Sequence, residues 1–292
     1  MAVFTLPPPM IGFYKTHINY LITHAVDADR RRYSNQEEGA RHFFDTEYYG
    51  LHPFDSVPRR WDQAAAKYTA DTLKAHGIVA WHIGRMVKKL TQAFIGLNLD
   101  LILHYSADLG HYVADAHVPL HTTRNYNGQF TGQLGIHAFW ESRIPELKAE
   151  SYDYLTGRAV YINNPLGAAW DAVKASFNAK DTVLGFEAEL NSRFPSDLKY
   201  AFEVREKKMV RVYSEAYTTA YSELMGNLVE RRMVESVRLL GCLWYTAWVD
   251  AGQPDLALLS NCEISDSLLK MHEQEFKQGE KHTERSIPGH SD

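Results

Sequence analysis

Five potential metal ligands lie between residues 111 and 141 of this chain. His111 and Asp115 are four residues apart, and His137 and Glu141 repeat the same spacing. On a helix, residues four apart lie on one face a turn apart, so each pair can hold one ion. His121 follows the expected end of the first helix, and its imidazole can turn toward the second pair. Imidazole and carboxylate ligands favour zinc, and two neighbouring ions favour hydrolysis.

A metal centre has to be weighed against simpler explanations for these residues. A single His-x-x-x-Asp or His-x-x-x-Glu pair is more often a surface pair or a core histidine than a ligand set. Residues 99–110, which precede His111, are apolar on most helical faces, so the helix that carries His111 is expected to be buried. Buried charged groups need partners, and a metal ion satisfies several at once. We therefore predict a metal centre, with a helical domain without metal as the alternative.

Two further motifs lie upstream of these pairs. Asp27 begins an Asp-x-x-Arg motif, and fifteen residues later His42 stands in the context Arg-His-Phe-Phe-Asp. Together with His-x3-Asp-x5-His and His-x3-Glu, this pattern resembles the ligand signature of the zinc-dependent phospholipase C and single-strand-specific nuclease superfamily. Members of that superfamily are all-helical and hydrolyse phosphodiesters with a cluster of three zinc ions. The resemblance covers residues 2–145 and leaves the rest of the chain without a matching motif.

The resemblance implies a set of zinc ligands, four for a first ion and three for a second. They are Asp27, His42, His111 and Asp115, then His121, His137 and Glu141. In the superfamily, the carboxylate that matches Asp115 also reaches a third ion, whose other ligands are an N-terminal Trp and a nearby His. The sequence starts Met-Ala-Val-Phe and lacks that Trp and His. We therefore expect two zinc ions, and we interpret Met1 as the start of a truncated chain.

The expected reaction is hydrolysis of a phosphodiester by water that zinc activates. By resemblance, Asp27 orients this water or accepts its proton and Asp115 joins the ions, so these two are the expected catalytic residues. The Gly-x-Ser-x-Gly motif of serine hydrolases and a Gly-rich phosphate loop are both absent. Glu141 and the Gly-x-His137 context resemble the phospholipase C branch. The alternatives are a single-strand-specific nuclease or 3'-nucleotidase, and a catalytically impaired relative whose metal is structural.

Composition is that of an ordinary globular protein. Of the 292 residues 45% are hydrophobic and 23% charged, and the formal net charge is -5, so the basic footprint of a duplex-binding protein is missing. The longest apolar runs are too short for a transmembrane helix. Cys242 and Cys262 are the only cysteines, and the sequence leaves open a disulfide or two buried thiols. By resemblance, the full-length protein is expected to be secreted or periplasmic, acting on a phospholipid or nucleotide phosphodiester.

Hydrophobic periodicity predicts an all-α fold with one multi-helix domain around the zinc cluster. Helices are expected at residues 62–76, 78–97 and 166–177, in the segment that carries His111, and throughout 196–250. The Gly- and Asn-rich residues 122–135 should form a loop, which must bring His121 and His137 to the same ion. The domain is expected to span residues 1–264, followed by a polar tail at 265–292 that ends in a solvated helix and frayed residues.

Overall fold

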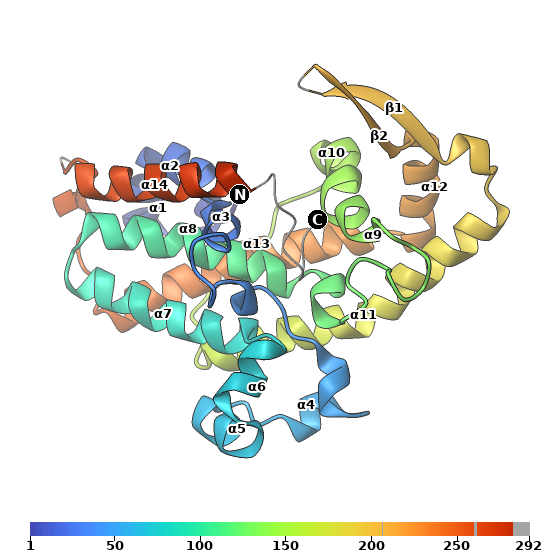
Figure 1. Ribbon diagram of the computed structural model, residues 1–292. Coiled ribbons are helices and arrows are strands. Elements are labelled where there is room, and N and C mark those ends of the chain that lie inside the picture. The colour runs from blue at the N-terminus through green and yellow to red at the C-terminus, as the bar shows by residue number, and fades with distance from the viewer. Residues whose placement is uncertain (206, 260–261, 283–292) are drawn as a thin grey trace.

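Four long helices build the centre of the molecule in the computed structural model (Figure 1). α7 (Val79–Ile95) and α8 (Leu99–Ala116) lie side by side, and α11 (Pro165–Arg193) and α13 (Leu228–Asp250) pack against them. α8 begins at Asn98, whose side chain accepts a hydrogen bond from the backbone N–H of Leu101. This cap satisfies one of the N–H groups that the first turn of any helix leaves without a partner. The structure describes residues 1–205, 207–259 and 262–282.

The other helices surround this group, and the expected all-α architecture is confirmed. They are α1 (Pro8–Thr16), α2 (Ile18–Thr23), α3 (Asp27–Arg31), α4 (Pro53–Ser56), α5 (Trp61–Tyr68), α6 (Ala70–Ala75), α9 (Ile136–Ala138), α10 (Ile144–Lys148), α12 (Glu215–Met225) and α14 (Asp266–His282). The helices form a single compact body. Among the described helices, none is both long and apolar enough to span a bilayer.

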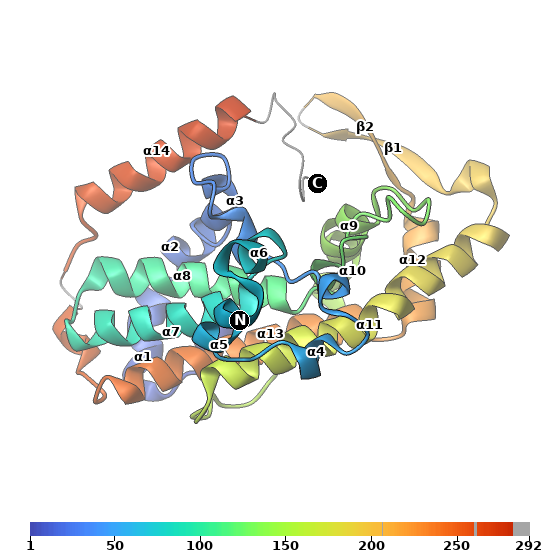
Figure 2. The ribbon, with the colours of Figure 1, turned by 60° about the horizontal axis from the view of Figure 1, so that its bottom comes forward.

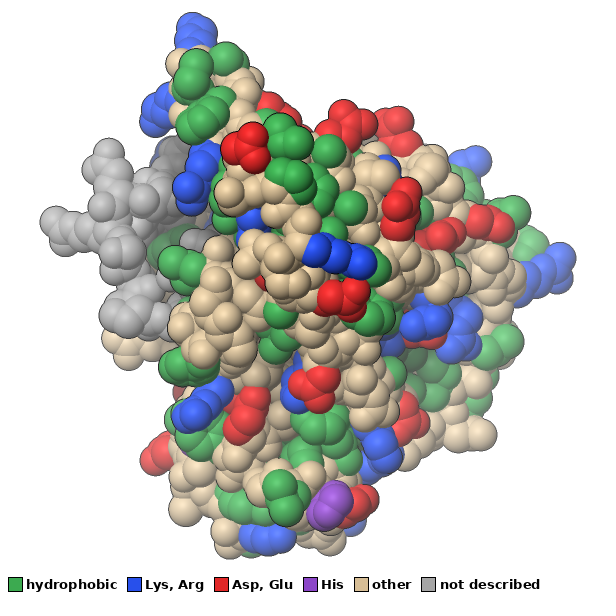
Figure 3. All heavy atoms as spheres, turned by 90° about the vertical axis from the view of Figure 1, so that its right-hand side faces the viewer, with side chains coloured by type: hydrophobic (Ala, Val, Ile, Leu, Met, Phe, Trp, Pro, Cys, Tyr) green, Lys and Arg blue, Asp and Glu red, His purple; other side chains and the backbone are tan. Residues whose placement is uncertain are grey.

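One β-hairpin interrupts the helical pattern. Strands β1 (Tyr200–Arg205) and β2 (Lys208–Tyr213) are antiparallel, and Figures 1 and 2 show them at the opposite end of the molecule from α14. On the face that carries the hairpin and α12, acidic and basic side chains are intermixed (Figure 3). The prediction of helices throughout residues 196–250 is therefore wrong for its first part. The sequence Tyr-Ala-Phe-Glu-Val-Arg alternates with the period of a strand, and this signal could have been found.

A second difference lies in the segment predicted as one helix over residues 62–76. It forms two helices, α5 and α6, which meet at Thr69. Thr69 has a positive φ of 66°, and its hydroxyl accepts a hydrogen bond from the backbone N–H of Thr72. The apolar period continues through both helices, so only the capping hydroxyl marks the break.

Two hydrophobic cores meet at the C-terminal end of α8. The larger core includes residues of α1, α2, α7, α8 and α13, and its last member on α8 is Ala116. The second begins at Val118 and Leu120 and continues through Ile136 and Phe139 to α11 and α12. Chain segments that carry potential ligands therefore cross from one core to the other.

Buried hydrogen bonds cap the end of α8 where the cores meet. The last carbonyl groups of an α-helix have no partner within the helix. Arg232 of α13, with a side chain only 4% exposed, donates to the carbonyl oxygen of His117 at 3.0 Å. Arg232 also donates to Ser176, whose hydroxyl donates to the carbonyl oxygen of Ala116. These bonds fix the point at which the chain leaves α8, next to Asp115.

The C-terminal residues differ in part from the expected solvated tail. α14 packs against α3, and both Leu268 and His272 are buried. The predicted polar tail covers residues 265–292, of which 283–292 lie outside the described part. The domain boundary at residue 264 stays a prediction. Cys242 is a buried free thiol and Cys262 an exposed one, so the disulfide is not formed and only one of the two thiols is buried.

Replacing Arg232 tests how strongly the cap supports the fold. We expect Arg232→Ala to lower the free energy of unfolding by roughly 2–3 kcal/mol, because it removes charged hydrogen bonds and leaves buried carbonyl groups unpaired. The measurement is urea denaturation followed by circular dichroism. Arg231→Ala, at an exposed position on the same helix, is the matched control and should change stability by less than about 0.5 kcal/mol. Equal effects of the two substitutions would contradict the capping role.

Candidate metal centre

Short elements at the junction of the two cores carry the potential ligands. His111 and Asp115 lie on successive turns of α8. After α8 ends, a 3₁₀ turn over residues 119–122 carries His121, as expected for a residue just past Pro119. His137 lies on α9, which continues into a π-helical turn that carries Glu141. The predicted loop at 122–135 contains no described helix or strand beyond that turn.

The first ligand group consists of Asp29, His42 and His111. The Nδ1 atom of His42 is 3.1 Å from the Nε2 atom of His111. The Oδ1 atom of Asp29 lies 3.7 Å from His42 Nδ1 and 3.5 Å from His111 Nε2. Three ligand atoms from three segments distant in sequence therefore face one point.

The second ligand group consists of His121, His137 and Glu141. The Nε2 atoms of the two histidines are 3.3 Å apart. The carboxylate oxygens of Glu141 lie 3.1 Å from His121 Nε2 and 3.0 Å from His137 Nε2. Zinc binds such atoms at about 2.0–2.1 Å, which in a tetrahedral shell places its ligands roughly 3.3 Å from one another. The spacing and the donor types of this group fit zinc.

Asp115 lies between the two groups. Its Oδ2 atom is 2.9 Å from His42 Nδ1 and 3.4 Å from His111 Nε2. Its Oδ1 atom is 3.6 Å from His121 Nδ1. One carboxylate thus lies beside ligand atoms of the first group and beside the outer nitrogen of one histidine of the second group.

The outward-facing ring nitrogens determine which nitrogens can bind metal. His111 Nδ1 is 3.0 Å from the carbonyl oxygen of Ala25, and His121 Nδ1 is 2.7 Å from that of His42. His137 Nδ1 lies 3.3 Å from the carbonyl oxygen of Tyr126. A carbonyl accepts only, so each Nδ1 carries hydrogen. In the neutral ring, each Nε2 then presents a lone pair to its ligand group, and such outer hydrogen bonds are typical of metal-binding histidines.

His42 is oriented the other way round and has a carboxylate behind it. Its Nδ1 faces the ligand group, while its Nε2 is buried, has no hydrogen bond and lies 3.6 Å from Glu38 Oε1. Glu38 is fully buried and accepts hydrogen bonds from Tyr112 and Arg41. Sequence reasoning missed Glu38, although it stands four residues before His42 and that spacing was available as a signal.

Neighbouring carboxylates control the charge of the histidines. Burial lowers the pKa of His111, but the charges of Asp115 and Asp29 outweigh it and raise the pKa to about 10. Burial likewise opposes protonation of His121, and the charges of Glu141 and Asp115 raise its pKa to about 9. Without a metal ion, these rings therefore hold protons that compensate the carboxylates.

The centre opens into a pocket of about 300 Å³. Asp29, His111, Asp115 and Glu141 contribute to its wall, together with side chains of α13 and the π-helical turn. The apolar and remaining polar lining residues are Ala114, His117, Val118, Trp140, Pro145, Val229, Arg232, Met233 and Ser236. The side chains of Asp29 and Glu141 are 43% and 26% exposed, so a substrate can approach the carboxylate side of both groups.

Six of the seven predicted ligands gather at this centre, and Asp27 does not join them. The structure places Asp29 with His42 and His111 instead. Both aspartates begin an Asp-x-x-Arg motif, with Arg30 and Arg32 respectively, so the sequence does not separate them. On helix α3, two residues apart means about 200° of rotation, and only one of the pair can face the centre.

Comparisons of the chain with protein-family models, with curated proteins and with solved structures gave no match. The geometry of the described residues supports His/Asp/Glu groups that can hold metal ions in a helical protein.

Zinc binding should release protons. Because the pKa values of His111 and His121 lie near 10 and 9, both rings are protonated at pH 7 and must lose hydrogen before they bind an ion. We expect roughly two protons to be released when both groups fill at pH 7, and the apparent zinc affinity to rise with pH until these pKa values are passed. Isothermal titration calorimetry in buffers of different ionisation enthalpy measures the number directly. Release of no protons at pH 7 would contradict this charge state.

Proposed function

We propose that this chain binds zinc at the two ligand groups and hydrolyses phosphodiester bonds in the manner of a phospholipase C. The observation that carries the proposal is the convergence of imidazole nitrogens and a carboxylate on one point. In the second group, His121 Nε2 and His137 Nε2 face each other at 3.3 Å while both Nδ1 atoms are engaged by carbonyl oxygens. The Glu141 carboxylate faces both nitrogens, and a zinc ion at this point would take the place of the proton that His121 holds at neutral pH.

A hydrolytic role is favoured over a purely structural one by the access that solvent has to the centre. A structural zinc site is closed by its protein ligands, whereas a catalytic site keeps a position open for water or substrate. Here each group provides three protein ligands and lies at the wall of the pocket. When bound, zinc ions would supply a water of lowered pKa and positive charge beside the phosphate oxygens.

The residues of the chain would divide the remaining tasks. Asp115 would supply a further carboxylate to the ion of the first group and contact His121 of the second group. Burial raises the pKa of Asp29, but the ion pair with His111 brings it below its ordinary value, so this carboxylate is ionised at neutral pH. With its exposed side chain on the pocket wall, Asp29 is placed to accept the proton of an attacking water, the role that the sequence suggested for Asp27.

The pocket wall supports a phospholipid as the substrate. Trp140, Val118, Val229 and Met233 line the wall of the pocket and can contact a glycerol backbone and the start of its acyl chains. Arg232 contacts the same pocket, but its guanidinium is engaged by Glu235 and by buried oxygens. Secretion or periplasmic location of the protein remains part of this proposal.

Hydrolysis assays with defined substrates test the function. Zinc-loaded protein is expected to cleave short-chain phosphatidylcholine and bis-nitrophenyl phosphate slowly, and to lose activity with a chelator. Asp115→Asn should lower the rate by more than about 100-fold, because even outer partners of metal ligands are worth 10–100-fold. His52→Ala, at an exposed histidine, is the control and should leave the rate unchanged.

Each outcome of these assays distinguishes one alternative. Faster cleavage of single-stranded DNA than of phosphatidylcholine would replace the phospholipase by the nuclease assignment. Zinc binding at both groups without hydrolysis of any of these substrates would contradict an enzymatic role and favour a structural metal.

A further inference from the structure

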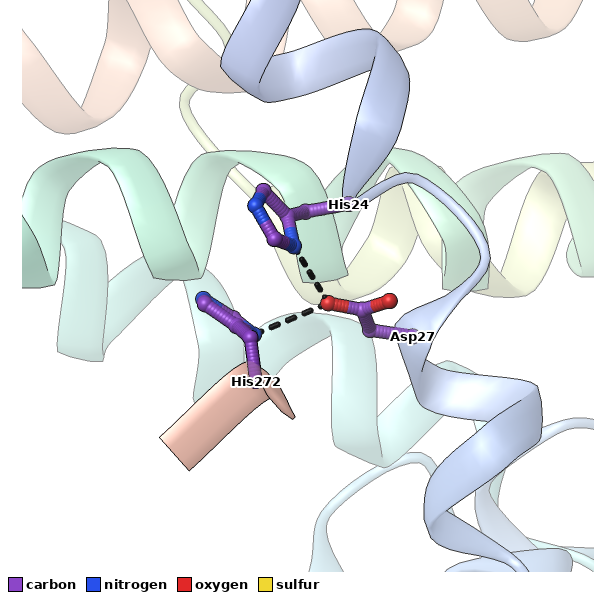
Figure 4. A group of neighbouring side chains, drawn as sticks. All are labelled: His24, Asp27 and His272. Atoms are coloured by element: carbon purple, nitrogen blue, oxygen red, sulfur yellow. Dashed lines mark hydrogen bonds and ion pairs between the residues drawn. The ribbon is translucent and has the colours of Figure 1, made fainter. Parts of the chain in front are cut away.

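A third group of potential ligands lies outside this centre and connects the two ends of the chain. Figure 4 shows His24, at the end of α2, and His272, on α14, with both imidazoles directed at Asp27. His24 Nδ1 is 2.6 Å and His272 Nδ1 is 2.8 Å from the Oδ2 atom of Asp27. We propose that these three residues form a separate zinc-type metal site that fastens α14 to the N-terminal helices.

The state of His272 is the first observation that points to an ion. The residue is only 6% exposed, and its Nδ1 atom is buried without a hydrogen bond of acceptable geometry, despite the short distance to Asp27. Its other nitrogen, Nε2, is 2.7 Å from the hydroxyl of Tyr20. This outer contact fixes the ring and leaves the Nδ1 lone pair available inside the group. The contact of this nitrogen with Asp27 Oδ2 is thus an ion pair without hydrogen-bond geometry, and a metal ion between the two atoms would bind both.

The two oxygens of Asp27 have separate roles, as in a ligand with outer support. Oδ1 accepts a hydrogen bond from Arg30 at 2.8 Å. Oδ2 faces only the two histidines in this group, and the whole residue is 2% exposed. The guanidinium thus orients the carboxylate without occupying the oxygen that would bind the ion.

Glu275 offers a fourth ligand from the next turn of α14. Its Oε2 atom is buried, makes no hydrogen bond and lies 3.7 Å from His272 Nδ1. Arg31 Nη1 is 3.6 Å from this oxygen, and the imidazole of His272 is the other basic group recorded beside it. Two carboxylates and two neutral imidazoles would compensate a divalent ion and leave it four-coordinate.

Only small movements separate the observed geometry from a filled site. Ligands of tetrahedral zinc stand roughly 3.3 Å apart, and here the two short distances are 2.6 and 2.8 Å. If each imidazole rotates so that its Nδ1 atom moves away from Asp27 Oδ2 by less than about an ångström, the ligand atoms reach the required spacing. His24, with a side chain 15% exposed, lies at the solvent side of the group and leaves a path for the ion.

The proposed site explains how a polar helix is held in place. Of the side chains described on α14, Leu268 and His272 alone are buried, and Met271 packs partly buried against the larger core, so few apolar side chains dock this helix. A metal ion would connect residues that are 248 positions apart in sequence, which stabilises a folded chain more than a local link does. Docking of α14 would then depend on metal.

Zinc counting on a substituted protein tests the site. We expect His272→Gln, which keeps the size and hydrogen-bonding capacity of the side chain, to bind one zinc ion fewer than the unsubstituted protein by elemental analysis. Hydrogen–deuterium exchange of residues 266–277 in the zinc-loaded protein should become faster. His104→Gln changes a histidine whose ring lies 5.7 Å from that of His272 but outside the group, and it should change neither readout.

A second pair of substitutions makes the result independent of the other centre. His137→Ala should lose zinc from the proposed active centre and keep the slow hydrogen exchange of α14. The test of the third site therefore does not depend on whether the proposed active centre hydrolyses phosphodiesters. If His272→Gln does not fold, His24→Gln decides, because His24 lies nearer to solvent. An unchanged zinc count, with unchanged exchange of α14, would overturn the site and show a hydrogen-bonded group only.

Discussion

The placement of Asp115 at the end of α8 is the constraint on which the candidate centre depends. Its carboxylate reaches His42 and His111 on one side and His121 on the other. It can do so because α8 stops one residue later, where Arg232 and Ser176 bind the last carbonyl groups. A helix continued by one more turn would carry His121 away from the second group. The capping bonds and the ligand geometry are therefore parts of one arrangement.

Local spacing explains why much of this centre was predictable from sequence. Pairs four residues apart remain neighbours on any helix, and even the π-helical turn keeps His137 and Glu141 on one face. The helices predicted for the segments of α7 and α8 are present in the structure, because the apolar residues of these segments repeat with a regular helical period over many residues. His121 was predictable because proline ends a helix nearby.

The spacing of residues in the sequence does not show which residues meet in the tertiary structure. Asp27 and Asp29 carry the same motif, and only the rotation of α3 relative to α8 decides which one meets His111. His272 has no local signal at all, because its partners lie at the other end of the chain. The β-hairpin is a different case, because the alternation of apolar and polar residues in β1 is a local signal for a strand within a segment predicted as helical.

The meeting of two hydrophobic cores at the metal groups has a mechanical consequence. His42 and His111 belong to segments packed on the larger core, whereas His121, His137 and Glu141 belong to segments packed on the second. The contacts of His121 with Asp115 and with the carbonyl oxygen of His42 connect these two packing units across the boundary between the cores. Conversely, a substitution deep inside either unit that shifts it by a few tenths of an ångström would misalign the ligands. Metal binding should then be sensitive to substitutions of core side chains that make no contact with either ligand group.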